Sequence, residues 1–133
     1  SEVQVQVQDW TGERLPYHAA AAGLALMSAW SDLEREHFAV AGPIAFTPFT
    51  ATSPDSLTAK MEELKATGAI WTLQEFAEDV NGVGAVIKGP SGTPVGAINV
   101  YGPTYRFPGN RPRDEITEAV TDACQRVTVR LTS

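Results

Sequence analysis

Cysteine, histidine and basic residues are scarce in this chain of 133 residues. The single cysteine, Cys124, cannot form a disulfide within the chain, so nothing indicates an oxidising compartment. The two histidines, His18 and His37, share no ligand-like spacing with each other or with Cys124, and we expect no metal site. Ten basic against 16 acidic residues give a net charge of −6, which is the wrong sign for direct binding to nucleic acid.

Long apolar runs and catalytic motifs are also missing. No apolar stretch approaches the roughly 20 residues that cross a membrane, and no signal peptide opens the sequence, so we expect a cytoplasmic protein with no membrane partner. The sequence has no G-x-S-x-G motif, and Cys124 lies inside a helical pattern rather than at a helix start, where a thiolate is favoured. We therefore expect no catalytic residue and no cofactor.

The length fits a single domain over residues 1–133. Alternating valines and glutamines predict a strand at 3–8, and a helix is expected from about 17 to 30, after Pro16. Ser31 and Glu34 have the spacing of a capping box for a helix at 32–41. Ser53 and Pro54 predict the start of another helix, which Gly68 ends.

The second half of the chain has the pattern of a meander followed by a helix. Strands are expected at 69–73, 83–88 and 95–101, and the turn-rich "GPSGTP" joins the last two. Between the first two strands, 74–81 has the composition of an acidic loop. The closing helix has an apolar face made of Ile116, Val120, Ala123, Val127 and Leu131. The order of elements predicts an α+β fold, in which helices pack on an antiparallel sheet.

Several polar or small residues admit both a structural and a functional interpretation. His18 anchors the start of a helix or exchanges protons with Glu75 or Glu78. The small residues at 19–23 let a helix press against the sheet, or leave room for a ligand whose anionic group meets backbone N–H groups. The acidic residues Glu75, Glu78 and Asp79 either supply a carboxylate pair for acid–base chemistry or belong to a solvated loop. Cys124 is interpreted as a small core residue.

Three stretches together resemble one known family. "RLPYHAAAAGLALMSAW" resembles the strand, turn and helix of IclR-type bacterial transcriptional regulators, in which a Leu-Pro-x-His-Ala run precedes small residues and a glycine. "FTPFTATSPDSL" resembles the family's threonine-rich loop before a Pro-capped helix. "IWTLQEFAEDVNGVGAVIKGPSGTPVGAINVYGPTYRF" resembles its acidic loop, its turn and the strand that ends in Gly-Pro. The resemblance covers essentially all of residues 5–132.

The resemblance implies a GAF-like effector-binding domain, which in this family follows a winged helix-turn-helix. It also implies that the chain lacks its N-terminal part, that DNA is bound through that part, and that the domain self-associates as a dimer or tetramer. The effector is expected to be a small organic acid, held between the sheet and the small-residue helix. The implied effector-binding residues are Val7, Leu15, Ala21, Ala22, Gly23, Glu75, Glu78, Ala85, Asn99 and Tyr101.

Several positions depart from the family pattern, and among them Phe76 and Ala77 interrupt the acidic run. Leu24 stands where a lysine is common, Ala85 where a cysteine or serine occurs, and Tyr101 where a serine is usual. The identity of the effector therefore does not carry over from the resemblance. An alternative hypothesis is an oligomerisation module whose vestigial pocket is filled by Tyr101.

Overall fold

The computed structural model describes residues 16–132. The predicted strand at 3–8 and the predicted site residues Val7 and Leu15 lie outside this range. The described elements are α1 (Ala21–Leu26), the 3-10 turn η1 (Met27–Ala29), α2 (Asp32–Val40), α3 (Pro54–Thr67), β1 (Ile70–Leu73), β2 (Val80–Lys88), β3 (Pro94–Pro103) and α4 (Arg113–Thr132). The predicted α+β class is confirmed.

Local capping fixes the ends of α2 and α3 as the sequence predicts. Ser31 and Glu34 form a complete capping box, and the hydrogen bonds from Ser31 to the Glu34 carboxylate lower the pKa of that carboxyl group. Ser53 caps α3 with Pro54 at the first helical position, and Gly68 ends the helix in the left-handed conformation, with φ of 87°.

The helix expected at 17–30 is shorter than predicted. Residues 16–20 form a turn, in which the N–H groups of Ala19 and Ala20 donate to the oxygen of Pro16. Ala20 is extended, with φ of −99° and ψ of 136°, so helical geometry begins only at Ala21. The His18 side chain holds this turn in place, because its Nε2 lies 2.6 Å from the backbone oxygen of Ile44.

The three strands form one antiparallel sheet in the order β1-β2-β3. Two rows of paired residues cross it: one joins Thr72, Gly82 and Tyr101, and the next joins Ile70, Gly84 and Asn99. Residues that pair directly across antiparallel strands project from the same face of the sheet. These six residues therefore share a face, and Val83 and Ala85 project from the opposite one.

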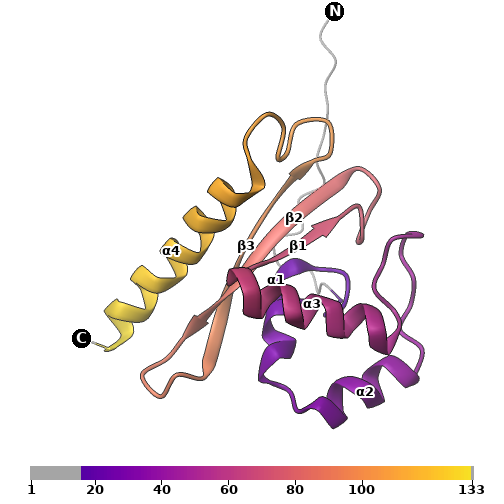
Figure 1. The fold of residues 1–133 in the computed structure, drawn as a ribbon, viewed down its shortest axis with the longest axis horizontal. Helices are drawn as coiled ribbons and strands as arrows, with labels where there is room; N and C mark the ends of the chain where they lie inside the picture. The colour runs from indigo at the N-terminus through magenta and orange to yellow at the C-terminus, as the bar shows by residue number, and fades with distance from the viewer. Residues whose placement is uncertain (1–15, 133) are drawn as a thin grey trace, which may run out of the picture.

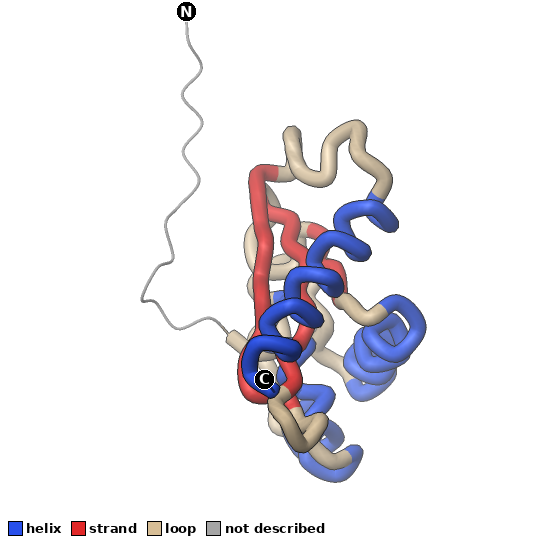
Figure 2. The backbone as a smooth tube through the Cα atoms, turned by 90° about the vertical axis from the view of Figure 1, so that its left-hand side faces the viewer, coloured by secondary structure: helices blue, strands red, loops and turns tan. Residues whose placement is uncertain are grey.

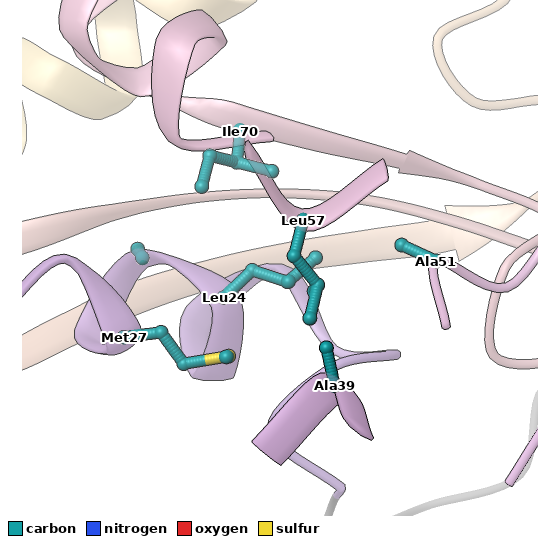
Figure 3. Close-up of a cluster of buried hydrophobic side chains, with 7 residues drawn as sticks. Leu24, Met27, Ala39, Ala51, Leu57 and Ile70 are labelled. Carbon is teal, nitrogen blue, oxygen red and sulfur yellow. The ribbon is translucent and has the colours of Figure 1, made fainter. Parts of the chain in front are cut away.

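Each face of the sheet is covered by different helices. α1 lies on the face of Gly84, because a Cβ at Gly84 would meet the backbone of Ala21 and Ala22. A hydrophobic cluster on this side joins α1, α2, α3 and β1 (Figure 3). Its buried residues are Leu24, Ala25, Met27, Ala39, Ala51, Leu57 and Ile70. A second cluster packs α4 on the other face, and Figure 1 shows α4 (yellow) to the left of the strands and α1–α3 to the right.

The predicted apolar face of α4 is confirmed at Ile116 and Val120, which are buried in this second cluster. Cys124 is the third buried residue of that face, whereas Leu131 is exposed. The sheet in Figure 2 is seen nearly edge-on, with α4 running along it.

The outer edge of β1 is covered by side chains of α3. The backbone N–H of Trp71 donates to Glu63 Oε2 at 2.8 Å, and Lys60 Nζ donates to the Trp71 oxygen at 2.6 Å. These bonds replace those that a neighbouring strand would make. An edge protected in this way does not readily pair with another chain.

Candidate functional site

A small cavity lies between the start of α1 and the sheet. It encloses about 20 Å³, which is about the space of one water molecule. Its lining comes from the turn before α1, from all three strands and from the β1–β2 loop: Ala19, Ala20, Ala21, Thr72, Phe76, Val80, Gly82, Asn99 and Tyr101. The cavity thus brings together Ala21, Asn99 and Tyr101, three of the residues predicted for the effector site.

Two glycines of β2 shape this region in different ways. A Cβ at Gly84 would lie 2.8 Å from the Ala21 carbonyl carbon and from the Ala22 nitrogen, so glycine is needed for α1 to approach the sheet. A Cβ at Gly82 would lie 3.0 Å from Thr72 Oγ1 and 3.6 Å from Tyr101 Cβ. The missing side chain at Gly82 therefore leaves the space between Thr72 and Tyr101 open.

Asn99 links β3 to α1 at the cavity. Its Oδ1 accepts a hydrogen bond of 3.2 Å from the backbone N–H of Ala22. Because a backbone N–H can only donate, the amide oxygen faces the helix, and the Nδ2 group is the part of the amide that remains to donate to a ligand. The Ala22 N–H is thus occupied by Asn99 and does not stand open as an anion site.

Gly23 has a packing role. A Cβ at this position would lie 2.6 Å from the backbone of Tyr17, so glycine lets the turn at 16–20 fold back against α1. Gly23 does not line the cavity. Of the three helical residues predicted for the effector site, Ala21 alone lines it.

Ala85 lies on the opposite face from Asn99, although both were expected to point inward. Asn99 pairs with Gly84, whereas Ala85 pairs with Ile98 and packs in the cluster beneath α4. A shift of one residue in register moves a side chain to the other face of the sheet. The run of small residues at 82–86 has no clear alternation of apolar and polar side chains, so the sequence does not decide which face Ala85 points to. Gly84 is the β2 residue across from Asn99.

The two predicted glutamates do not line the cavity. Glu75 is buried, and its Oε2 accepts from Lys60 Nζ at 2.8 Å and from the Leu73 N–H at 2.9 Å. Its Oε1 is buried and has no hydrogen-bond partner among the described residues. Glu78 and Asp79 are exposed, as a solvated acidic loop predicts. Glu75 therefore joins α3 to the end of β1.

His18 and Cys124 have the structural environments that the simpler interpretation expected. His18 is buried between the rings of Phe38 and Phe46, and no residue from 16 to 132 makes a hydrogen bond to its Nδ1. Burial raises the pKa of the Cys124 thiol, which disfavours the nucleophilic thiolate. Within residues 16–132, no group of three or more acidic, histidine or cysteine side chains is placed to hold a metal ion. Over the same range, no helix has the length and apolar character to span a membrane.

A larger, open groove of about 990 Å³ is lined by residues of α2, α3, α4 and β2. Of the predicted site residues that the structure describes, it is lined by Ala85 alone. We assign the candidate site to the small cavity, because three of the predicted site residues line it, namely Ala21, Asn99 and Tyr101.

Sequence reasoning missed Thr72, Phe76, Val80 and Gly82 as lining residues. Thr72 had a weak signal, since it is the polar residue in the otherwise apolar strand "AIWTL". Phe76 had none, because its position depends on how the β1–β2 loop folds.

Comparison with known proteins places this chain in one family. The family model described as the C-terminal domain of the bacterial transcriptional regulator IclR matches residues 1–129. The chain therefore belongs to this family, as an effector-binding domain of transcriptional regulators. The family consists of regulators and not of enzymes, so the hypothesis of acid–base catalysis by His18 receives no support.

Individual relatives agree with this membership. The HTH-type transcriptional repressor AllR of Salmonella paratyphi A is 31% identical over 101 residues, which cover 75% of this chain and 37% of AllR. AllR of Escherichia coli K12 is 30% identical over the same shares. The chain thus spans little more than a third of the length of the curated relatives it matches.

Solved structures share the fold. An IclR transcriptional regulator from Silicibacter sp. TM1040 is 27% identical with a TM-score of 0.81, and the match covers 100% of this chain and 51% of that one. The inducer-binding domain of PobR from Acinetobacter, in complex with 3-hydroxybenzoic acid, is 19% identical with a TM-score of 0.77, over 94% of this chain and 74% of that one. At this identity, PobR shows the fold alone.

Proposed function

We propose that this domain senses a small organic acid at the cavity between α1 and the sheet, and that the bound acid alters DNA binding by a linked winged helix-turn-helix. The observation that carries the proposal is the position of Asn99. Its amide stands at the cavity with the oxygen fixed on the Ala22 N–H, which leaves Nδ2 as a donor for a carboxylate. Alanines, Phe76 and Val80 provide apolar walls around this amide.

The size of the cavity supports a sensor rather than a static binding protein. A space of about 20 Å³ admits one water-sized group, so even a short acid requires the surrounding side chains or α1 to move. A ligand shifts a conformational equilibrium when it binds one conformation better than the other. An acid that binds only the opened cavity meets this requirement.

The names of related proteins are consistent with this proposal. AllR is called an HTH-type repressor, and a PobR domain of the same fold holds 3-hydroxybenzoic acid. For the whole protein to which this chain belongs, we propose that it binds DNA, that it is cytoplasmic and that its effector is an acid.

Replacing Asn99 with aspartate is expected to abolish acid binding and to preserve the fold. The aspartate oxygen still accepts the Ala22 N–H, but the amide donor becomes a negative charge facing the carboxylate of the ligand. The measurement is the thermal shift of the full-length regulator with lactate, pyruvate, benzoate and 3-hydroxybenzoate. An acid at about 100 times its Kd adds about 2.7 kcal/mol to the free energy of unfolding of the wild type.

Asn110→Asp is the matched control, because it makes the same chemical change at an exposed loop residue that does not line the cavity. It should keep the full thermal shift. An unchanged shift in Asn99→Asp would remove Asn99 from the site, and no shift for any acid with the wild type would reject the proposed effector class.

A second candidate function, self-association, is favoured by an exposed apolar surface. Large apolar side chains are exposed along α2 and the segment after it, at Leu33, Val40, Ile44, Phe46 and Phe49. Leu33 and Val40 are seven residues apart and so share one side of α2. Exposed apolar residues gathered in this way are typical of protein contact surfaces.

The double substitution Val40→Lys with Ile44→Lys is expected to shift the regulator toward the monomer, with at least a tenfold weaker association. Two lysines at the centre of an apolar contact must be desolvated there. The molar mass is measured by light scattering over a range of protein concentrations. Ala66→Lys, on an exposed position of α3, is the control and should not change the molar mass. An unchanged mass in the double variant would locate self-association elsewhere.

A further inference from the structure

The turn that precedes α1 contacts both the cavity and a segment at the protein surface. Ala19 and Ala20 of this turn line the cavity. Their neighbour His18 is buried, and its Nε2 lies 2.6 Å from the backbone oxygen of Ile44. Because a carbonyl oxygen can only accept, Nε2 carries the proton of this hydrogen bond. The Ile44 side chain is 69% exposed, so a single turn joins the cavity wall to an exposed apolar residue.

Aromatic rings form a second connection between the cavity and this surface. Phe76 lines the cavity, and its ring centroid lies 5.6 Å from that of Phe46. The Phe46 ring is also 5.7 Å from the His18 ring. Phe46 is an exposed member of the apolar surface that we consider for self-association. Both connections therefore lead from the cavity to residues of that surface.

Hydrogen bonds attach the following residues to the β1–β2 loop. Thr47 Oγ1 donates to the Gln74 oxygen at 2.6 Å, and Thr50 Oγ1 donates to the Glu75 oxygen at 2.5 Å. The same loop carries the phenylalanine that lines the cavity. Residues 44–50, which we call the 44–50 segment, are thus bound both to the turn before α1 and to the β1–β2 loop.

The walls of the cavity differ in how firmly they are held. The sheet wall belongs to a continuous antiparallel ladder from β1 to β3. The turn has long hydrogen bonds, of 3.4 Å from the Ala19 nitrogen and 3.2 Å from the Ala20 nitrogen to the Pro16 oxygen. A space of about 20 Å³ has to open before an organic acid fits. We therefore expect the turn and the β1–β2 loop to move, rather than the sheet.

We propose that opening of the cavity displaces the 44–50 segment through His18 and Phe46, so that a bound acid weakens self-association at the apolar surface. This inference rests on the proposed function of the cavity and on the second candidate function. The centre of a protein interface is packed as closely as a protein interior, so a displaced Ile44 or Phe46 no longer fits the partner copy. His18 is a positioning residue here, because it does not line the cavity and only 5% of its surface is exposed.

Hydrogen exchange of the full-length regulator tests the displacement directly. The probe is whichever of lactate, pyruvate, benzoate and 3-hydroxybenzoate gives the largest thermal shift. The backbone N–H groups of Phe46 and Thr47 both donate to Thr50 Oγ1. Their exchange is expected to become at least about fivefold faster when the acid binds. Exchange around Val120, in the cluster under α4 on the other face of the sheet, should not change.

Dissociation of subunits would also speed exchange in the 44–50 segment, and one variant separates the two effects. The double variant Val40→Lys with Ile44→Lys, which is expected to be monomeric, keeps the Ile44 backbone oxygen. It should show the same faster exchange with the acid. Faster exchange in the wild type alone would be a result of dissociation and would overturn the proposed displacement.

Light scattering then measures the Kd of self-association with and without saturating acid. The acid is expected to raise this Kd of the wild type by at least about fivefold. His18→Asn should abolish the effect, because its shorter side chain does not bring an N–H group to the Ile44 oxygen. His18→Gln should keep most of the effect, because its amide nitrogen reaches about the position of Nε2. Val120→Ala lowers stability on the other face of the sheet and should keep the whole effect.

The results distinguish this inference from the proposed function. If none of the four acids binds the wild type, the proposed function fails and the coupling falls with it. If an acid binds but leaves both the exchange of the 44–50 segment and the Kd of self-association unchanged, the coupling is wrong and acid sensing stands. An undiminished effect in His18→Asn, or an equal loss in His18→Asn and Val120→Ala, would show that His18 does not connect the two sites.

Discussion

Replacing Lys60 with methionine is expected to lower the free energy of unfolding by about 3–5 kcal/mol, which is the usual cost of removing one partner of a buried ion pair. The ammonium group of Lys60 lies 2.8 Å from Glu75 Oε2, and the two side chains are 16% and 8% exposed. Methionine fills a similar space but leaves the Glu75 carboxylate with the Leu73 N–H as its remaining donor. The Trp71 oxygen at the edge of β1 also loses its donor. Urea denaturation, followed by circular dichroism, measures the change.

Two variants separate the loss of the ion pair from the loss of a lysine. Lys65→Met changes an exposed lysine of the same helix and should alter the stability by less than about 0.5 kcal/mol. The double variant Lys60→Met with Glu75→Gln removes both charges and should recover part of the stability, because no unpaired charge remains buried. Equal stability of Lys60→Met and Lys65→Met would show that Lys60 and Glu75 do not form a buried pair.

Replacing Gly84 with alanine is expected to cost about 3 kcal/mol, toward the upper end of the range for overpacked cores. The added Cβ would lie 2.8 Å from the backbone of α1, at the Ala21 carbonyl carbon and the Ala22 nitrogen. A backbone cannot rotate away as a flexible side chain can, so α1 has to move from the sheet. The hydrogen bond from the Ala22 N–H to Asn99 then lengthens, and acid binding should be lost together with stability.

Gly96→Ala is the control for this effect. Gly96 is also in the sheet, but a Cβ there would meet Ile87 Cδ1 at 3.9 Å, which is an ordinary contact. Alanine at this position should change stability by less than about 1 kcal/mol, because it only adds a well-accommodated methyl group. If Gly84→Ala and Gly96→Ala unfold at the same urea concentration, the close approach of α1 to β2 is not required by the fold.

Local signals in the sequence were sufficient for most of the fold. The ends of α2 and α3 are set by neighbouring residues, such as Ser31 with Glu34 and Ser53 with Pro54, and these were predicted correctly. The start of α1 was not, because it depends on the bond from His18 to the oxygen of Ile44, 26 residues away. Where a boundary depends on a distant contact, a local pattern does not contain it.

The candidate site was predictable only in part, for the same physical reason. Asn99 and Ala21 were predicted from the family resemblance, and the structure places both at one cavity. Ala85 was assigned to the wrong face because the small residues at 82–86 fit either register. Glu75 was expected near the effector, but its partner Lys60 lies 15 positions earlier on a different element, and no spacing rule connects the two.

The side chains of Lys60 and Glu63 cover the β1 edge of the sheet, so a further strand would be added at the opposite edge. At β1, the Glu63 carboxylate and the Lys60 ammonium group already bind the Trp71 backbone groups that another strand would pair with. In the described part of the chain, β3 forms the opposite edge of the sheet. Asn99 and Tyr101 belong to that border strand. Any segment that docked beside β3 would therefore be an immediate neighbour of two residues that line the cavity, so occupancy of the cavity and docking at this border would influence each other through a single strand.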